Sequence, residues 1–248
     1  MKKIALVTGA SRGIGREAAL RLAASGYGLV LTAYKNKTEL DKTAKEARML
    51  CADRPVYTAL CDVSSPDAVQ DLFDELSSLK MTEDISLLVN NAGISSFELI
   101  QDISDEQWHH VIDVNLTGAF YMCRGVVPYM IKRKSGRIIN ISSYWGEAGS
   151  SMESAYCASK GGLNAFTLSL AKELEPSKIT VCALSCEYID TDMNAAFTKD
   201  EIAEILKTMP SGRVISPSEA AAMICLLADP SFPAEGRIYS MNELLKII

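Results

Sequence analysis

The feature that most constrains the fold is a regular alternation of short apolar runs with longer amphipathic segments. Short runs that are apolar throughout are typical of parallel strands, because both faces of a parallel sheet are covered. Strands are predicted over Ile4–Val7, Gly28–Ala33, Val56–Cys61, Ile85–Val89, Arg137–Ile141, Ile179–Leu184 and Arg237–Tyr239. Helices are predicted over Gly13–Ala24, Lys37–Cys51, Ala68–Leu79, Asp105–Ile131, Ser154–Leu174 and Pro217–Leu227. Repeated strand–helix units predict an α/β fold with a doubly wound parallel sheet of about seven strands and helices on both faces.

The length of 248 residues fits one α/β domain over 1–248 better than two smaller domains. Three helix starts carry a capping hydroxyl followed by a proline or by a glutamine or glutamate three residues later. They are Ser65-Pro66, Ser104 with Gln107, and Ser216-Pro217 with Glu219. The least regular segment runs from Glu187 to Ser216, with one short helical stretch near Thr198–Lys207. We expect this segment, residues 187–216, to form a substrate lid.

Composition excludes several kinds of partner. A net charge of −6 argues against nucleic-acid binding, because a phosphate-binding face needs a surplus of basic residues. No apolar stretch reaches the length that spans a membrane, and the first apolar run, Ile4–Val7, breaks too early for a secretory signal. The only histidines, His109 and His110, are adjacent and predicted to be exposed on a helix, so no metal site is expected. Seven scattered cysteines without CxxC spacing indicate reduced thiols in a cytoplasmic protein.

A glycine-rich turn joins the first predicted strand directly to the first predicted helix. It reads Thr8-Gly9-Ala10-Ser11-Arg12-Gly13-Ile14-Gly15. Glycines allow a tight turn and a close approach of backbone to a pyrophosphate, while the helix N-terminus supplies free N–H groups. In this strand–turn–helix setting the pattern predicts a Rossmann-like dinucleotide site. The expected contacts are Gly9, Ser11, Arg12, Gly13, Ile14 and Gly15.

The end of the second predicted strand indicates which dinucleotide binds. Residues 31–37 contain no carboxylate to bind a ribose diol or to repel a phosphate. Arg12 and Lys35 instead supply cations near Tyr34, which favours the 2′-phosphate of NADP(H) over NAD(H). A solvated loop lysine is the alternative interpretation of Lys35.

Tyr156 and Lys160 are four residues apart on one predicted helix and therefore share a face. A cation beside a tyrosine stabilises the phenolate and lowers a phenol pKa that is about 10 in isolation. Such a phenol exchanges a proton with a ketone or an alcohol near neutral pH. Ser143, after the fifth predicted strand, can hydrogen-bond the developing oxyanion. On a helix a tyrosine–lysine pair alone is common, so its weight depends on the other motifs.

Together these motifs resemble the short-chain dehydrogenase/reductase family over nearly the whole chain. Thr8–Gly15, Asn90-Asn91-Ala92-Gly93, Asn115, Ser143 and Tyr156/Lys160 occur in the family's order. Residues 189–193 and 210–213 look most similar to 3-oxoacyl-[acyl-carrier-protein] reductases. The resemblance implies that Tyr156 is the acid/base, Lys160 binds the nicotinamide ribose, Ser143 holds the carbonyl and Asn115 positions a relay water. It further implies that Asp62 and Val63 contact adenine, that Asn91, Ala92 and Gly93 line the adenosine ribose, and that Ile189 and Thr191 contact the carboxamide.

The chain departs from the family at Cys186-Glu187, where Pro-Gly is usual. We interpret Cys186 as a small packed thiol and Glu187 as a side chain that points to solvent. The alternative is that Glu187 lies near the nicotinamide ring, where a carboxylate would favour the oxidised cofactor NADP⁺. The departure keeps a second hypothesis open, a non-catalytic nucleotide-binding or regulatory protein that retains the fold. A sugar-nucleotide epimerase or dehydratase shares Tyr-x-x-x-Lys chemistry but usually has a longer chain. The predicted function is thus NADP(H)-dependent hydride transfer at a carbonyl or alcohol carbon.

The substrate class is open among acyl thioesters, steroids, sugars and small ketones, with Tyr144 and Trp145 as an expected aromatic wall or ordinary packing. The two longest predicted helices carry more apolar positions than one sheet-facing surface needs. As in the family's dimers and tetramers, we expect an intersubunit helix bundle. Its predicted members are Met122, Cys123, Val126, Val127, Phe166 and Leu170.

Overall fold

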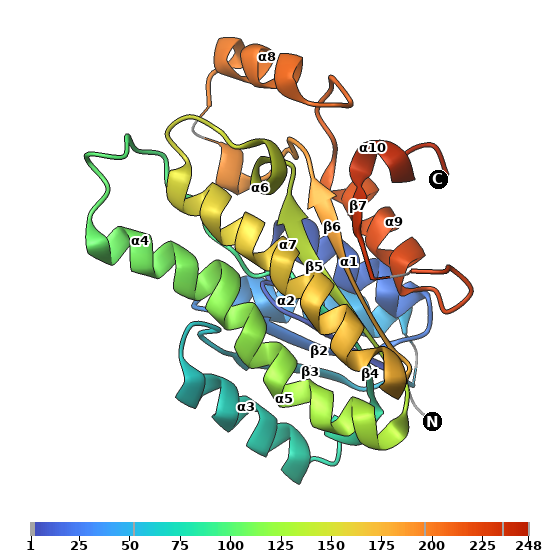
Figure 1. Cartoon of the computed structure of the whole chain (residues 1–248). Coiled ribbons are helices and arrows are strands. Elements are labelled where there is room, and N and C mark those ends of the chain that lie inside the picture. Colours follow the sequence, from blue (N-terminus) through green and yellow to red (C-terminus); the bar gives the residue numbers. More distant parts are fainter. Residues whose placement is uncertain (1–2, 52, 196, 235, 248) are drawn as a thin grey trace.

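Seven parallel strands form one central sheet in the order β3-β2-β1-β4-β5-β6-β7 (Figure 1). The strands are β1 Ile4–Val7, β2 Gly28–Ala33, β3 Val56–Leu60, β4 Ile85–Asn90, β5 Gly136–Ser143, β6 Ile179–Cys186 and β7 Ile238–Ser240. This computed structural model describes residues 3–51, 53–195, 197–234 and 236–247. Residues 1–2, 52, 196, 235 and 248 of the predicted 1–248 domain lie outside the described residues. The doubly wound α/β fold is confirmed.

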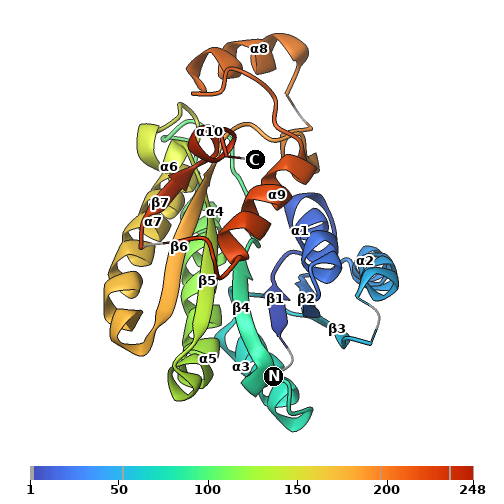
Figure 2. The same ribbon diagram turned by 90° about the vertical axis from the view of Figure 1, so that its right-hand side faces the viewer.

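Helices cover both faces of the sheet (Figures 1 and 2). One face carries α1 (Gly13–Ala24), α2 (Lys37–Leu50) and α9 (Pro217–Ala228); the other carries α3 (Pro66–Ser78), α5 (Gly118–Arg133) and α7 (Ser154–Leu174). Each layer buries its own hydrophobic cluster. Leu22, Leu40 and Ile224 belong to the first cluster, and Phe73, Met122 and Val126 belong to the second.

The second cluster corrects the predicted subunit interface. Met122, Cys123 and Val126 are at most 2% exposed and pack within the protomer against the sheet and α3. These three residues are therefore core residues and not interface residues. Val127, Phe166 and Leu170 are half-buried against the same cluster.

Helix starts follow the local sequence. The Ser65 hydroxyl accepts a hydrogen bond from the backbone N–H of Ala68, and capping boxes begin α4 (Asp105–Ile112) and α9 at Ser104 and Ser216. All three predicted starts are confirmed. A fourth capping box, Thr198 with Glu201, begins α8 (Lys199–Thr208). Because the hydroxyls satisfy N–H groups that lack a partner inside the helix, they fix where each helix begins.

The predicted continuous helix over Asp105–Ile131 is wrong in its middle. A π-helical turn over Asp113–Thr117 separates α4 from α5. It contains Asn115, which is 1% exposed and whose side chain bonds to both backbone groups of Ile94. These tertiary bonds stabilise a turn wider than an α-helix, and such turns are frequent at functional sites.

Strands β5 and β6 extend two residues beyond their predicted carboxyl ends, which places Ser143 beside Cys186 in the sheet.

Two short helices were not predicted, α6 (Trp145–Ala148) and α10 (Met241–Leu244). Short 3₁₀ turns cover Thr82–Asp84, Glu175–Ser177 and Asp192–Asn194. Helix α8 lies beyond the carboxyl ends of the strands, apart from both helical layers (Figures 1 and 2). None of the helices in the described part of the chain combines the length and apolar character that crossing a bilayer requires.

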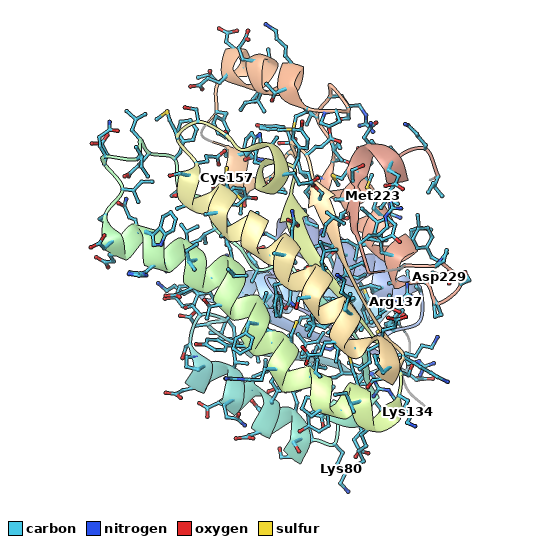
Figure 3. The ribbon with its side chains drawn as sticks, viewed as in Figure 1. Lys80, Lys134, Arg137, Cys157, Met223 and Asp229 are labelled. Atoms are coloured by element: carbon cyan, nitrogen blue, oxygen red, sulfur yellow. The ribbon has the colours of Figure 1, made fainter. Side chains whose placement is uncertain are left out.

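The opposite edge of the molecule is built from helix ends and loops. Lys80 and Lys134 lie there, at the lower end in Figure 3, with φ of 55° and 51° at the ends of α3 and α5. A left-handed residue stops a helix, since its N–H turns back to the last carbonyls. Arg137 at the start of β5 donates to the carbonyl of Phe232 and lies close to Asp229 beyond α9 (Figure 3).

Candidate active site

A cleft at the carboxyl ends of the strands gathers most of the predicted site residues. Ligands of doubly wound sheets bind at this edge, where the strand order reverses between β1 and β4. The predicted residues that line the cleft are Gly9, Ser11, Arg12, Gly13, Ile14, Tyr34, Asp62, Val63, Asn91, Ala92, Gly93, Ser143, Tyr156, Lys160, Ile189 and Thr191. Gly15, Lys35 and Asn115 do not line it.

The glycine turn is fixed against the loop that follows β4. The Thr8 hydroxyl accepts hydrogen bonds from the N–H groups of Asn91 (3.0 Å) and Ala92 (2.9 Å). Gly9 has a φ of 66°, a conformation that favours glycine. A Cβ on Gly15 would lie 2.4 Å from the Gly9 carbonyl oxygen, so Gly15 permits close packing and does not contact the cleft.

The N-terminus of α1 opens into this cleft next to the glycine turn. Its N-cap residue, Arg12, makes no side-chain capping hydrogen bond. The first N–H groups of α1 and the positive end of its dipole are therefore free of side-chain capping and suited to an anion. Together with the close-packed glycines, they fit the pyrophosphate of a dinucleotide.

The two cations predicted to bind the phosphate, Arg12 and Lys35, differ in their position relative to the cleft. Arg12 forms an exposed ion pair with Asp192 at 3.1 Å, beside the cleft. Lys35 is not among the residues that line the cleft, and its Nζ lies 4.3 Å from the centroid of the Tyr34 ring. Ala33 and Tyr34, at the end of β2, do line the cleft. Cation–π attraction to Tyr34 accounts for the position of Lys35.

Ser143, Tyr156 and Lys160 meet at the deep part of the cleft. Ser143 ends β5, whereas Tyr156 and Lys160 lie one turn apart in the first half of α7. Lys160 is 5% exposed, and its Nζ donates to the Ile141 carbonyl at 2.8 Å and lies 5.7 Å from the centroid of the Tyr156 ring. Burial lowers the pKa of Lys160 to about 8 because desolvation disfavours the ammonium.

The pKa of Tyr156 corrects one expectation. Burial raises the pKa of this phenol, and hydrogen bonding with Ser143 only partly offsets the rise. We expected Lys160 to lower the pKa of Tyr156, and this expectation is wrong for the protein without a cofactor. The Lys160 ammonium is bonded to Ile141, and desolvation of the phenol dominates. At neutral pH the phenol therefore carries its proton and is a hydrogen-bond donor.

Asn115 ties separate segments together behind the cleft. Its side-chain oxygen accepts from the Ile94 N–H (2.8 Å), and its amide donates to the Ile94 carbonyl and to the Ser159 hydroxyl, both at 2.9 Å. Ser159 in turn donates to the Tyr156 carbonyl at 2.7 Å. The side chain thus holds the loop after β4 against α7. A role in positioning water stays a prediction.

The Cys186-Glu187 departure is buried. Cys186 is 7% exposed, and burial raises its pKa to about 12, in keeping with a packed, unreactive thiol. The expectation that Glu187 points to solvent is wrong. Glu187 is 8% exposed, lines the cleft, and accepts a hydrogen bond from the Ser211 N–H at 2.8 Å through Oε2. This hydrogen bond brings the segment around Ser211 against Glu187, whose carboxylate is largely removed from water.

Sequence reasoning missed Glu153. This residue directly precedes α7, is 3% exposed, lines the cleft and accepts from the Ser95 hydroxyl at 2.8 Å. Burial raises the pKa of Glu153, and the hydrogen bond from Ser95 partly opposes the rise. No local pattern marks it, because its burial depends on a loop about 60 residues earlier in the chain. In the described residues no cluster of three or more histidine, cysteine, aspartate or glutamate side chains could hold a metal ion.

Comparison with known proteins agrees with this geometry. The family model described as short chain dehydrogenase matches residues 3–202, and the chain belongs to this family of oxidoreductases. It is 36% identical to the uncharacterized oxidoreductase YmfI of Bacillus subtilis, over 98% of each chain. It is 39% identical to a 3-oxoacyl-[acyl-carrier-protein] reductase of Synechocystis, over 92% of this chain and 90% of that protein. The corresponding reductase FabG of Escherichia coli is 35% identical, over 91% and 89%.

Proposed function

We propose that the protein is an NADP(H)-dependent oxidoreductase that interconverts a carbonyl and an alcohol. The observation that carries the proposal is the meeting of Ser143, Tyr156 and Lys160 in the same cleft as the glycine turn of α1. A protein that only binds nucleotide has no chemical need for a buried lysine beside a tyrosine and a serine. Cys186-Glu187 favours that alternative, but neither residue displaces the three catalytic side chains.

The cofactor fits the residues of the cleft. The turn at Gly9–Gly13 and the α1 N-terminus would hold the pyrophosphate, Asp62 and Val63 the adenine, and Asn91 the adenosine ribose. Ile189 and Thr191 would contact the carboxamide, and Lys160 the nicotinamide ribose. When bound, the reduced nicotinamide supplies the hydride for the carbonyl carbon.

Two side chains then act on the substrate oxygen. Ser143 donates a hydrogen bond that stabilises the negative charge developing there. Tyr156 transfers its phenolic proton to the same oxygen, which completes the alcohol, and solvent later returns a proton to the phenolate. Lys160, with a pKa of about 8, is mostly protonated at neutral pH and would donate to the nicotinamide ribose. Alcohol oxidation uses the same groups in reverse.

The preference for NADP(H) rests on the end of β2. Ala33 and Tyr34 line the cleft and carry no carboxylate that would repel a 2′-phosphate. Arg12 also lines the cleft and supplies a cation, although it shares its charge with Asp192. We expect the phosphate to compete with Asp192 for Arg12.

We further propose one catalytic domain with a lid over residues 187–216 and a homodimeric or homotetrameric assembly in the cytoplasm. Helix α8 lies in the proposed lid, and an isolated bridge between Ile189 and Ile215 joins the two sides of its base. The outer surface of α5 and α7 supports the assembly, since Phe120 and Leu168 there are 40% and 38% exposed. The free cysteines fit a reducing compartment.

The test is a panel of carbonyls and alcohols assayed with both NADPH and NADH. The named relatives support a 3-oxoacyl thioester as one member of the panel. We expect NADPH consumption with at least one ketone. Tight binding of NADPH with no turnover across the panel would instead favour the non-catalytic alternative.

A further inference from the structure

Two glutamates in the cleft each keep one carboxylate oxygen without a hydrogen-bond partner among the described residues. In Glu153, Oε1 accepts from Ser95 and Oε2 has no partner. In Glu187, Oε2 accepts from Ser211 and Oε1 has no partner. Both side chains are more than nine-tenths buried. A buried acceptor without a donor is unfavourable and rare in native proteins, so a donor from a ligand is the natural complement.

The two glutamates approach the catalytic groups from different elements. Glu153 stands three residues before Tyr156, at the start of α7. Glu187 directly follows Cys186, which pairs with Ser143 across β5 and β6. Both therefore line the cleft close to the catalytic groups, which is the end where a substrate would bind. Resting on the function proposed above, we propose that this end recognises a carbonyl substrate that bears a primary ammonium group.

The charges around the cleft agree with a cationic substrate. The salt bridges found among the described residues include neither Glu153 nor Glu187. Arg213, which lies close enough to sense the charge of Glu187, is paired with Glu219 at 2.7 Å. Among the described residues the Lys160 Nζ donates to the Ile141 carbonyl and forms no salt bridge with either glutamate. An ammonium suits a cleft lined by such carboxylates, because it carries three N–H groups and a positive charge.

A second hollow adjoins the cleft at Trp145, which lines both. Phe97 and Phe197, whose rings are 5.4 Å apart, give it apolar walls. Its described lining also contains Asp200, Glu201 and Glu204, and no lysine or arginine. Such a lining suits an apolar chain with a positive end and disfavours carboxylates and phosphates.

The first test measures binding without turnover. Calorimetry on the full chain compares n-hexylammonium, n-hexanol and hexanoate, which differ only in the charge and donors of one end. We expect n-hexylammonium to bind at least about tenfold more tightly than n-hexanol, with hexanoate the weakest. Glu153→Gln and Glu187→Gln should each reduce this preference severalfold. Glu173→Gln, which removes the same charge from the exposed end of α7, should leave it unchanged. Equal binding of the amine and the alcohol, or a preference that survives in both pocket variants, overturns the inference.

A second measurement separates this inference from the proposed function. Methyl ketones that end in an ammonium, a hydroxyl or a carboxylate are reduced with NADPH, and kcat/KM is compared. The inference predicts the highest value for the ammonium ketone and a loss of this advantage in Glu153→Gln. If the hydroxyl ketone is reduced equally well, the ammonium site is refuted and the reductase stands. If neither these ketones nor any member of the substrate panel is reduced but n-hexylammonium still binds preferentially, the reductase is refuted and the ammonium site stands.

Discussion

Replacing Lys160 by methionine should make the protein more stable while it abolishes turnover. Burial lowers the pKa of Lys160 from 10.5 to about 8. At about 1.4 kcal/mol per pH unit, the folded protein disfavours the ammonium by about 3 kcal/mol below pH 8. Methionine has a similar shape and no charge, but it loses the hydrogen bond to Ile141, worth about 1 kcal/mol. The expected net gain at pH 7 is about 2 kcal/mol.

The stability gained in Lys160→Met should decrease as pH rises. Between about pH 8 and 10.5 the unfolded chain holds the Lys160 proton and the folded protein does not, so the wild type gains stability as pH rises. The advantage of Lys160→Met is therefore largest below pH 8 and disappears towards pH 10.5. Urea unfolding of both proteins from pH 7 to pH 10 measures it, with the exposed Lys172→Met on the same helix as the matched control. A variant that is less stable than wild type at pH 7, or a difference that does not change with pH, would refute the reasoning.

Four further outcomes are expected. Tyr156→Phe should keep cofactor binding, measured by NADPH fluorescence, and lower turnover by a factor on the order of 10² or more because the proton donor is lost. Ala33→Asp should weaken NADPH relative to NADH through repulsion of the 2′-phosphate, which titration with each nucleotide measures. Gly15→Ala should lower Tm by several degrees, since its Cβ would lie 2.4 Å from the Gly9 carbonyl oxygen. Light scattering at micromolar concentration should show a dimer or tetramer, and Phe120→Asp should shift it towards monomer.

Most elements of the fold could be predicted because their signals are local. β1, β2, α1 and α7 have the predicted bounds, since an apolar period and a helix-start signal are properties of neighbouring residues. The break at Asn115 could not be predicted, because Ile94 and Ser159 stabilise it from other parts of the chain. Apolar periodicity contains no information on these distant contacts and therefore predicts one continuous helix over residues 105–131.

The site residues also divide into those that local patterns predict and those whose positions depend on distant contacts. The glycine turn and the Tyr156–Lys160 pair are local patterns, and the structure brings them to one cleft. The positions of Glu153 and Glu187 depend on Ser95 and Ser211, far away in sequence. The predicted interface failed at Met122 for a related reason: apolar spacing shows how many faces of a helix are buried, but not whether the sheet, a neighbouring helix or another subunit covers them.

The packing of α9 on α1 has a consequence for how the protein is made. The two helices bury a common cluster around Leu22 and Ile224 but are separated by about 190 residues. At typical synthesis rates of about 5–20 residues per second, α1 waits on the order of 10–40 s for its partner. During that time the apolar side of α1 is open to contacts with other nascent chains. A helix that leaves the ribosome late, α9, therefore closes the first nucleotide-binding unit, and we expect yield during expression to depend on chaperones more than the final stability suggests.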